Sequence, residues 1–366
     1  MSERVQQIRD VLSTNRLLIL SGPLGAGRSE LCREALGAQD FQWWNLGEKA
    51  IRKKVQAMEA KELFEASGVI VFQEAQRLDH FQEMLEAFLF GEWNTHLICI
   101  CSGNPPIDEV LKEALEAQGL ILEILPPSFK ELAGELGPIR FDQQLEQRLI
   151  YGHLADLEQE EEDLKQELLS RAEFLWNGMM TGKGRINKEE ELHRLLSYLA
   201  LKLGENISFN ELGNLCGLDN QTVERYVELL EDAYVLIKLP SYQSGQRYEM
   251  KKGILVYFYD NGIRNALINN FNPMELRLDQ EVLWKNWLIS ERHKLVGRKE
   301  GQWFWQTHTG QQVDYLEQKG EQLRAYQLSW NKKKRRKWPK SFLSHYPEVK
   351  TSQLDRSTYW NFLSRD

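Results

Sequence analysis

The chain has 366 residues, of which 42% are hydrophobic, and this length predicts two or three domains with cores of their own. Its four cysteines form no C-x-x-C pair, which disfavours disulfide-rich and zinc-binding classes. No apolar run approaches the roughly 18 residues of a membrane span, and the N-terminus has no signal-peptide pattern, so a soluble cytoplasmic protein is expected.

The formal net charge of −8 is divided unevenly along the chain. Residues 1–250 carry 25 Lys and Arg against 42 Asp and Glu, whereas residues 251–366 carry 21 against 12. The C-terminal part is therefore expected to meet an anionic partner or to dock on the acidic remainder.

Five short apolar runs alternate with helical patterns in the first 137 residues. The runs are Leu17–Leu20, Phe41–Asn45, Val69–Phe72, Leu97–Cys101 and Leu120–Leu125, and helices are expected at 29–36, 54–65 and 82–89. Short buried strands that alternate with helices predict an α/β fold with a mostly parallel sheet covered on both faces.

A glycine-rich sequence, GPLGAGRS, follows the first run at residues 22–29 and matches G-x-x-x-x-G-K-[ST] except for its lysine. Glycines let the backbone amides turn toward phosphate oxygens, and the next helix adds its positive N-terminal end. The residues predicted to bind a nucleotide are Gly22, Gly25, Ala26, Gly27, Arg28, Ser29 and Glu30. Arg28 replaces the lysine, so phosphate attraction should survive better than transition-state geometry. The alternative is a glycine-rich turn without a ligand.

Two polar strand ends complete the predicted nucleotide site. Gln73 and Glu74 follow the third apolar run, where a Walker-B motif has an aspartate for Mg²⁺ and a glutamate that polarises water. Gln73 and Ser29 are expected to hold Mg²⁺ only weakly, and Glu74 is either a general base or an exposed strand-end residue. Ser102 and Asn104 either sense the γ-phosphate or form an ordinary turn. The predicted cofactors are ATP or ADP with weakly held Mg²⁺.

Residues 138–189 are expected to form an acidic helical lid or linker, and residues 190–245 three helices followed by a strand. Helices at 210–215 and 220–230 are joined by a glycine-containing turn, which predicts a helix-turn-helix with a wing strand. Residues 186–240 carry five Lys and Arg against ten Asp and Glu, which opposes duplex binding and favours packing or protein contact.

The C-terminal residues combine strands, a helix and a basic run. Strands are expected at 254–259, 303–307, 312–317 and 322–329, and a helix at 280–294. The basic run is Lys332, Lys333, Lys334, Arg335, Arg336 and Lys337, between Trp330 and Trp338. It can bind nucleic-acid phosphates while a tryptophan stacks on a base, or it is solvated charge beside two core tryptophans.

Taken in order, these segments resemble a large bacterial and archaeal family that joins an AAA-type ATPase domain, a winged helix and a C-terminal restriction-endonuclease-like domain. The resemblance covers nearly the whole chain and rests on GPLGAGRS, VIVFQEAQRL (69–78), ICICSGN (98–104), LPPSFKEL (125–132), residues 206–240, YFYDNGI (257–263), WKNWLISE (284–291) and residues 309–329. It implies an ATP-binding domain at 1–137, a lid at 138–189, a winged helix at 190–245 and a nuclease-like α/β domain at 246–366.

The resemblance also implies a nuclease-like site, which is degenerate in this chain. Asp314 is kept, but Gln327 and Ser329 replace the usual E-x-K, and Lys285 stands at the earlier glutamate position. Glu291 is expected to add a second carboxylate from its helix. Such nucleases hold Mg²⁺ with two acids and position water with the lysine, so we expect no nuclease activity.

Three functions remain open from the sequence. The first is an ATP-binding AAA-type module that responds to nucleotide, with residual hydrolysis at most. The second is a non-enzymatic pseudo-ATPase scaffold, and the third is a nucleic-acid binder without nuclease activity. The protein partner and the oligomeric state are left open.

Overall fold

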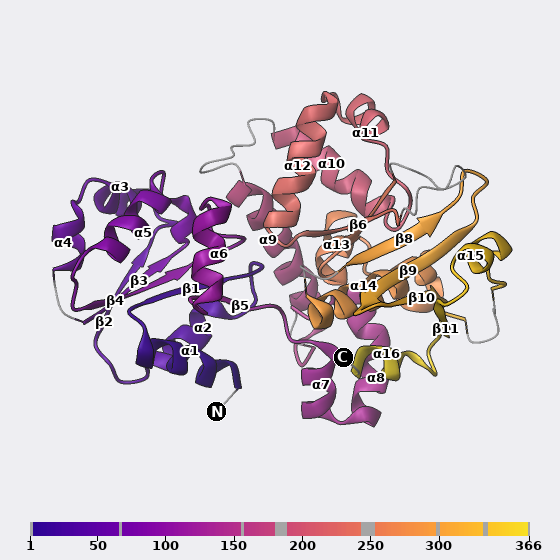
Figure 1. The fold of residues 1–366 in the computed structure, drawn as a ribbon, viewed down its shortest axis with the longest axis horizontal. Coiled ribbons are helices and arrows are strands. Elements are labelled where there is room, and N and C mark those ends of the chain that lie inside the picture. Colours follow the sequence, from indigo (N-terminus) through magenta and orange to yellow (C-terminus); the bar gives the residue numbers. More distant parts are fainter. Residues whose placement is uncertain are drawn as a thin grey trace. The chain divides into compact units, whose positions relative to one another are not determined.

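The structure is a computed structural model. It describes residues 3–65, 68–154, 157–179, 189–242, 253–297, 301–331 and 336–364. The chain divides into two compact units (Figure 1). Unit 1 comprises residues 1–126, 177–187 and 232–234, and unit 2 comprises residues 127–176, 188–231 and 235–366. Among the described helices, none combines the length and the apolar character needed to cross a bilayer.

Unit 1 is an α/β fold around a five-stranded parallel sheet with helices on both faces (Figure 1). The strands are β1 (Leu17–Ser21), β2 (Phe41–Asn45), β3 (Gly68–Gln73), β4 (Thr95–Ile100) and β5 (Ile121–Glu123), in the order β2-β3-β4-β1-β5. The helices are α1 (Glu3–Thr14), α2 (Arg28–Leu36), α3 (Lys49–Gln56), α4 (Ala60–Phe64), η1 (Ala75–Arg77), α5 (Phe81–Phe90) and α6 (Glu109–Ala117). The five predicted strands are confirmed to within two residues.

The core of unit 1 lies on both faces of this sheet because successive strand residues point to opposite sides. Leu17 and Ile19 of β1 join the cluster formed with α3, α4, α5 and α6. Leu18 and Leu20 join the cluster formed with α1 and α2. Because both faces of the sheet are buried, the strand sequences are continuously apolar rather than alternating between apolar and polar residues.

The single helix predicted at 54–65 is wrong, because two helices with a turn between them occupy that stretch. The amides of Ala57 and Met58 bond to Lys54 O and Val55 O and end α3. This turn lets Val55 of α3 and Phe64 of α4 reach the same core cluster.

Unit 2 contains the later helices and two small sheets. The elements from residue 129 onward are α7 (Phe129–Leu136), α8 (Pro138–Tyr151), α9 (Glu161–Met179), α10 (Glu189–Leu201), α11 (Phe209–Cys216), α12 (Asn220–Asp232), β6 (Leu236–Pro240), β7 (Ile254–Phe258), α13 (Asn261–Leu267), η2 (Met274–Leu276), α14 (Gln280–Val296), β8 (Gln302–Gln306), β9 (Gln312–Lys319), β10 (Gln322–Leu328), α15 (Lys340–His345), β11 (Lys350–Leu354) and α16 (Tyr359–Ser364).

The strands of unit 2 form an antiparallel pair and a mixed four-stranded sheet. β6 pairs with β7, so the boundary expected after residue 245 falls between two paired strands. The larger sheet has the order β11-β10-β9-β8, in which β11 runs parallel to β10 and the other pairs are antiparallel. β11 was not predicted, because its sequence, KTSQL, is mostly polar and its first three residues are exposed.

Helices α7 and α8 are separated by a single residue, Gly137. Ser128 and Glu131 form a reciprocal capping box at the start of α7. Gly137, at φ +77°, ends α7, and Pro138 begins α8, where its missing amide is tolerated. Phe129, at the start of α7, packs edge-on against Phe141 of α8, with ring centroids 4.9 Å apart.

Candidate functional site

The glycine-rich sequence forms the turn from β1 to α2 at the carboxyl edge of the sheet. Gly22 has φ +139°, and a Cβ there would lie 2.1 Å from Ile124 O, so only glycine fits. Its carbonyl accepts the Gly103 amide at 2.9 Å, which ties the loop to the end of β4. Gly27, at φ +79°, begins α2 without a side-chain cap. The first turn of α2 thus offers its amides to an anion.

Arg28 turns inward across the loop. The side chain is 6% exposed, and its Nη1 donates to Pro23 O inside the loop. Its Nη2 donates to Ser102 Oγ at 2.9 Å. Nε is buried and has no hydrogen-bond partner among the described residues. Burial lowers the pKa of the Arg28 guanidinium, while the negative charge of Glu74 raises it.

Glu74 lies at the end of β3 and joins the same network. It is 7% exposed and has φ +58°, a backbone conformation that non-glycine residues rarely adopt. Its Oε1 accepts from Ser102 Oγ at 2.5 Å. Its Oε2 accepts from Gln76 Nε2 at 2.9 Å and from Arg77 Nε at 3.3 Å. Ser102 therefore connects the cation on the glycine-rich loop to the carboxylate after β3.

Gln73, the expected weak Mg²⁺ ligand, makes a different contact. Its Oε1 accepts a hydrogen bond from Trp43 Nε1 on the neighbouring strand β2, at 2.9 Å. Trp43 is in turn covered by Arg33 of α2, whose guanidinium carbon lies 3.7 Å from the ring centroid. The side-chain oxygen of Gln73, the expected cation ligand, is thus held by the indole.

The remaining predicted residues of this site are placed around the loop. Ser29 is half-buried and Glu30 exposed in the first turn of α2. The Ala26 amide donates to Pro23 O at 3.3 Å, within the loop. Asn104 does not join Arg28. Its side chain bonds to Asp232 and Tyr234, which group with unit 1.

Sequence reasoning missed three members of this cluster, namely Trp43, Gln76 and Arg77. Gln76 also accepts the Ser102 amide at 3.1 Å, so its side chain binds both Ser102 and Glu74. Its position two residues after Glu74 was a usable signal, because the short helix η1 turns the chain back. The side chains of Gln76 and Arg77 therefore lie beside the end of β3. Trp43 had no such signal, because its role depends on β2 pairing with β3.

In unit 2, the residues predicted to form a degenerate nuclease-like site lie on β9, on β10 and directly after β10. Asp314 of β9 is 1% exposed, and its Oδ2 accepts the Leu328 amide of β10 at 2.9 Å. Gln327 Oε1 accepts from Gln353 Nε2 at 3.1 Å, and Ser329 Oγ donates to a neighbouring carbonyl. The structure therefore brings Asp314 beside β10, which carries Gln327 and is followed by Ser329.

Two cations neutralise Asp314. Lys285 Nζ of α14 lies 2.9 Å from Oδ1, and Arg336 Nη1 lies 2.7 Å from Oδ2. The predicted nuclease-like site would need this carboxylate to hold a metal. Here its oxygens already contact ammonium and guanidinium groups, which repel a divalent cation.

The expectation that Glu291 adds a carboxylate to this site is wrong. Glu291 is 4% exposed, and its oxygens bond to His153 Nδ1 at 3.1 Å, to Lys294 Nζ and to the Phe129 amide at 2.6 Å. His153 Nε2 also accepts from Trp287 Nε1 at 3.0 Å. Glu291 therefore joins α14 to the segment of α7 and α8, through partners more than a hundred residues away in sequence.

Most of the predicted basic run, Lys332–Arg335, lies outside the described residues. Arg336 is taken by Asp314, and Lys337 is exposed. The flanking tryptophans pack against protein: Trp330 lies beside Trp284, and Trp338 stacks on Phe342.

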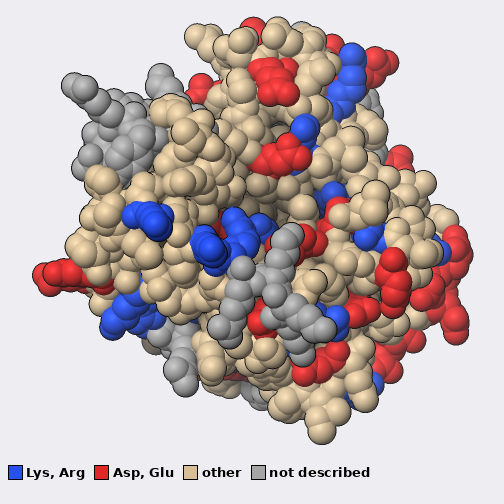
Figure 2. Space-filling model, turned by 90° about the vertical axis from the view of Figure 1, so that its right-hand side faces the viewer, with Lys and Arg blue, Asp and Glu red and all other residues tan. Residues whose placement is uncertain are grey.

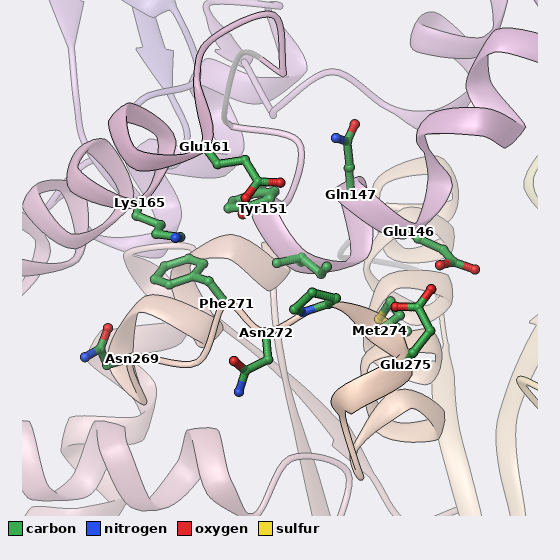
Figure 3. A pocket seen from close by; sticks show the side chains of 12 residues that line it. Glu146, Gln147, Tyr151, Glu161, Lys165, Asn269, Phe271, Asn272, Met274 and Glu275 are labelled. Atoms are coloured by element: carbon green, nitrogen blue, oxygen red, sulfur yellow. The ribbon is translucent and has the colours of Figure 1, made fainter.

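A separate hollow of about 460 Å³ opens in unit 2 between α8, the start of α9 and the loop before η2 (Figure 3). Tyr151 and Phe271 stack at its wall, with centroids 5.8 Å apart. Glu146 and Glu275 lie on the opposite side in this view. No residue predicted from the sequence as a site residue lines it.

The comparisons with known proteins give distant matches. Residues 179–274 match a family model described as a domain of unknown function, DUF8612. An uncharacterized protein of Haemophilus influenzae is 22% identical over 314 residues, which cover 80% of this chain and 70% of that protein.

Among solved structures, the Walker-type ATPase PABY2304 of Pyrococcus abyssi is 13% identical, with a TM-score of 0.43, over 73% of this chain and 95% of that one. A signal-transduction ATPase (STAND) protein with a tetratricopeptide-repeat sensor from Pyrococcus horikoshii is 11% identical, with a TM-score of 0.27, over 80% of this chain and 45% of that one. These scores are too low to establish a shared fold, so we base the function on the residues of this chain.

Proposed function

We propose that this chain is an AAA-type nucleotide-binding protein with weak or no ATP hydrolysis. The observation that carries the proposal is the Arg28 guanidinium, buried beside the glycine-rich loop with an unpartnered Nε. A buried donor without an acceptor costs about 1–3 kcal/mol, and a bound anion removes that cost. The uncapped start of α2 attracts the same anion. A nucleotide phosphate is the anion that suits a glycine-rich strand-to-helix turn.

The contacts of Glu74 support weak hydrolysis. A general base must be free to accept a proton from the attacking water. Both oxygens of Glu74 already accept hydrogen bonds, from Ser102 on one side and from Gln76 and Arg77 on the other. We assign Ser102, rather than Asn104, as the residue that responds to phosphate, because Ser102 contacts Arg28 directly.

The test is calorimetric titration of nucleotide-stripped protein with ADP and with ATP. Arg28→Ala should weaken binding by about tenfold or more, because a charge-assisted contact contributes about 1.5–3 kcal/mol. Arg140→Ala is the matched control, since it removes an arginine from an exposed pair with Glu158 in unit 2. If the wild-type protein shows neither heat nor a thermal shift at millimolar nucleotide, a pseudo-ATPase scaffold becomes the better description.

The finer fold assignments are part of the proposal. Helices α10, α11 and α12 followed by the β6-β7 pair support a winged helix, which then extends beyond residue 245. The mixed sheet, with Asp314 on β9 beside the start of α14, supports a nuclease-like domain. Neither assignment implies cleavage, since Gln327 and Ser329 supply neither the second acid nor the lysine.

A second candidate is nucleic-acid binding by the C-terminal part without cleavage. The favouring observation is that two cations, Lys285 and Arg336, surround the single carboxylate of Asp314. Lys and Arg side chains also gather near the middle of the face in Figure 2, with Asp and Glu mainly toward its right-hand edge. Filter binding of DNA across a salt series tests this idea, and a flat salt dependence would exclude phosphate contacts.

A further inference from the structure

The groups that would hold Mg²⁺ beside the loop are either neutral or already bonded. Mg²⁺ prefers hard oxygen ligands in octahedral geometry, and in nucleotide sites it uses one or two carboxylates besides phosphates. Ser29 offers a neutral hydroxyl, and Gln73 Oε1 accepts from Trp43. Both oxygens of Glu74 are engaged. In the described part of the chain, no three His, Cys, Asp or Glu side chains come together as a metal site.

The hydrogen-bonded network around Glu74 carries a net positive charge. Arg28 and Arg77 both bond into the network of Glu74, so its three charged side chains sum to one positive charge. The Arg28 side chain is nine-tenths buried and has an unpartnered Nε. Its Nη1 is held by Pro23 O, a contact that a phosphate oxygen can replace.

We infer that this loop binds the phosphates of a nucleoside di- or triphosphate without Mg²⁺, with Arg28 supplying the positive charge that the metal supplies elsewhere. The donor set does not fit the metal, whereas a guanidinium offers forked donors that match phosphate oxygens. This inference rests on the proposed nucleotide binding. It adds that the ligand is the metal-free anion, so Mg²⁺, which complexes ATP in solution, competes with the site.

The experiment measures binding of ATP and of ADP to nucleotide-stripped full-length protein, once in excess Mg²⁺ and once in excess EDTA. Wild-type affinity in EDTA should equal or exceed that in Mg²⁺. An affinity that falls by about tenfold or more in EDTA overturns the inference but leaves nucleotide binding intact. Absence of binding in both buffers removes the proposed function together with the inference.

A pair of variants tests the donor-set argument. Arg28→Lys combined with Gln73→Asp restores a thin cation and a carboxylate, and should make binding about tenfold tighter in Mg²⁺ than in EDTA. Gln118→Asp is the control, since it adds a carboxylate at the exposed end of α6. If the double variant binds equally in both buffers, the donor set is not what excludes the metal. The wild-type comparison does not depend on either variant folding.

Discussion

Glu291→Gln is the most informative perturbation of unit 2, because it removes one charge from a fully enclosed network. The carboxylate bonds to His153, Lys294 and the Phe129 amide, and the side chains of Glu291, His153 and Lys294 are each 3% exposed. Glutamine keeps the shape but leaves the Lys294 ammonium without a counter-charge. Removing one partner of a buried pair costs about 3–5 kcal/mol.

The pKa of Glu291 gives a second measure of how much its charge contributes to folding stability. Burial raises this pKa, but the charges and hydrogen bonds of Lys294 and His153 outweigh burial and lower it from 4.5 to about 2. At about 1.4 kcal/mol for each pH unit, this difference corresponds to about 3 kcal/mol of stability. Because the folded pKa is the lower one, this contribution is complete above pH 4.5 and is lost as the pH falls toward 2.

Urea unfolding at neutral pH, with hydrogen–deuterium exchange of α8 and α14 peptides, measures the loss in unit 2. Glu291→Gln should lower the free energy of unfolding by about 3 kcal/mol or more and flatten the dependence of stability on pH between 4.5 and 2. Glu275→Gln, an exposed glutamate in the same unit, is the control. A Glu291→Gln protein within about 0.5 kcal/mol of wild type would refute the reasoning.

Three further perturbations follow. Asp314→Asn should leave two unneutralised cations and tighten DNA binding in EDTA as well as in Mg²⁺, by filter binding, whereas loss of binding would indicate a metal role for Asp314. Gly22→Ala should destabilise unit 1 by more than about 2 kcal/mol in thermal unfolding, because its Cβ would lie 2.1 Å from Ile124 O; an unchanged midpoint would contradict the loop geometry. Ser102→Ala removes the hydroxyl that bonds to both Arg28 and Glu74, and calorimetry should show weaker nucleotide binding. An unchanged affinity would contradict a role for Ser102 in binding.

Local patterns were sufficient for much of unit 1. The run Leu17–Leu20 followed by GPLGAGRS predicted a buried strand, a glycine turn and a helix start, and the structure has each of them. These features depend on neighbours in sequence, since burial on two faces selects apolar residues and the tight turn selects glycine. The break between α3 and α4 was not predicted. It depends on tertiary packing, because Val55 of α3 and Phe64 of α4 both enter the same core cluster.

By itself, the sequence determined the parallel sheet, the loop at its carboxyl edge, and the replacement of the expected lysine and aspartate by Arg28 and Gln73. All of these depend on residue type and local spacing. Only the tertiary structure decided what those residues do. Arg28 reaches Ser102 because β4 lies beside β1, and Gln73 meets Trp43 because β2 lies beside β3. Glu291, predicted to join Asp314, instead contacts His153, a partner 138 positions earlier in the chain. Contacts between distant segments form when packing brings their side chains together. The periodicity within one segment predicts its secondary structure but does not identify the segment it packs against.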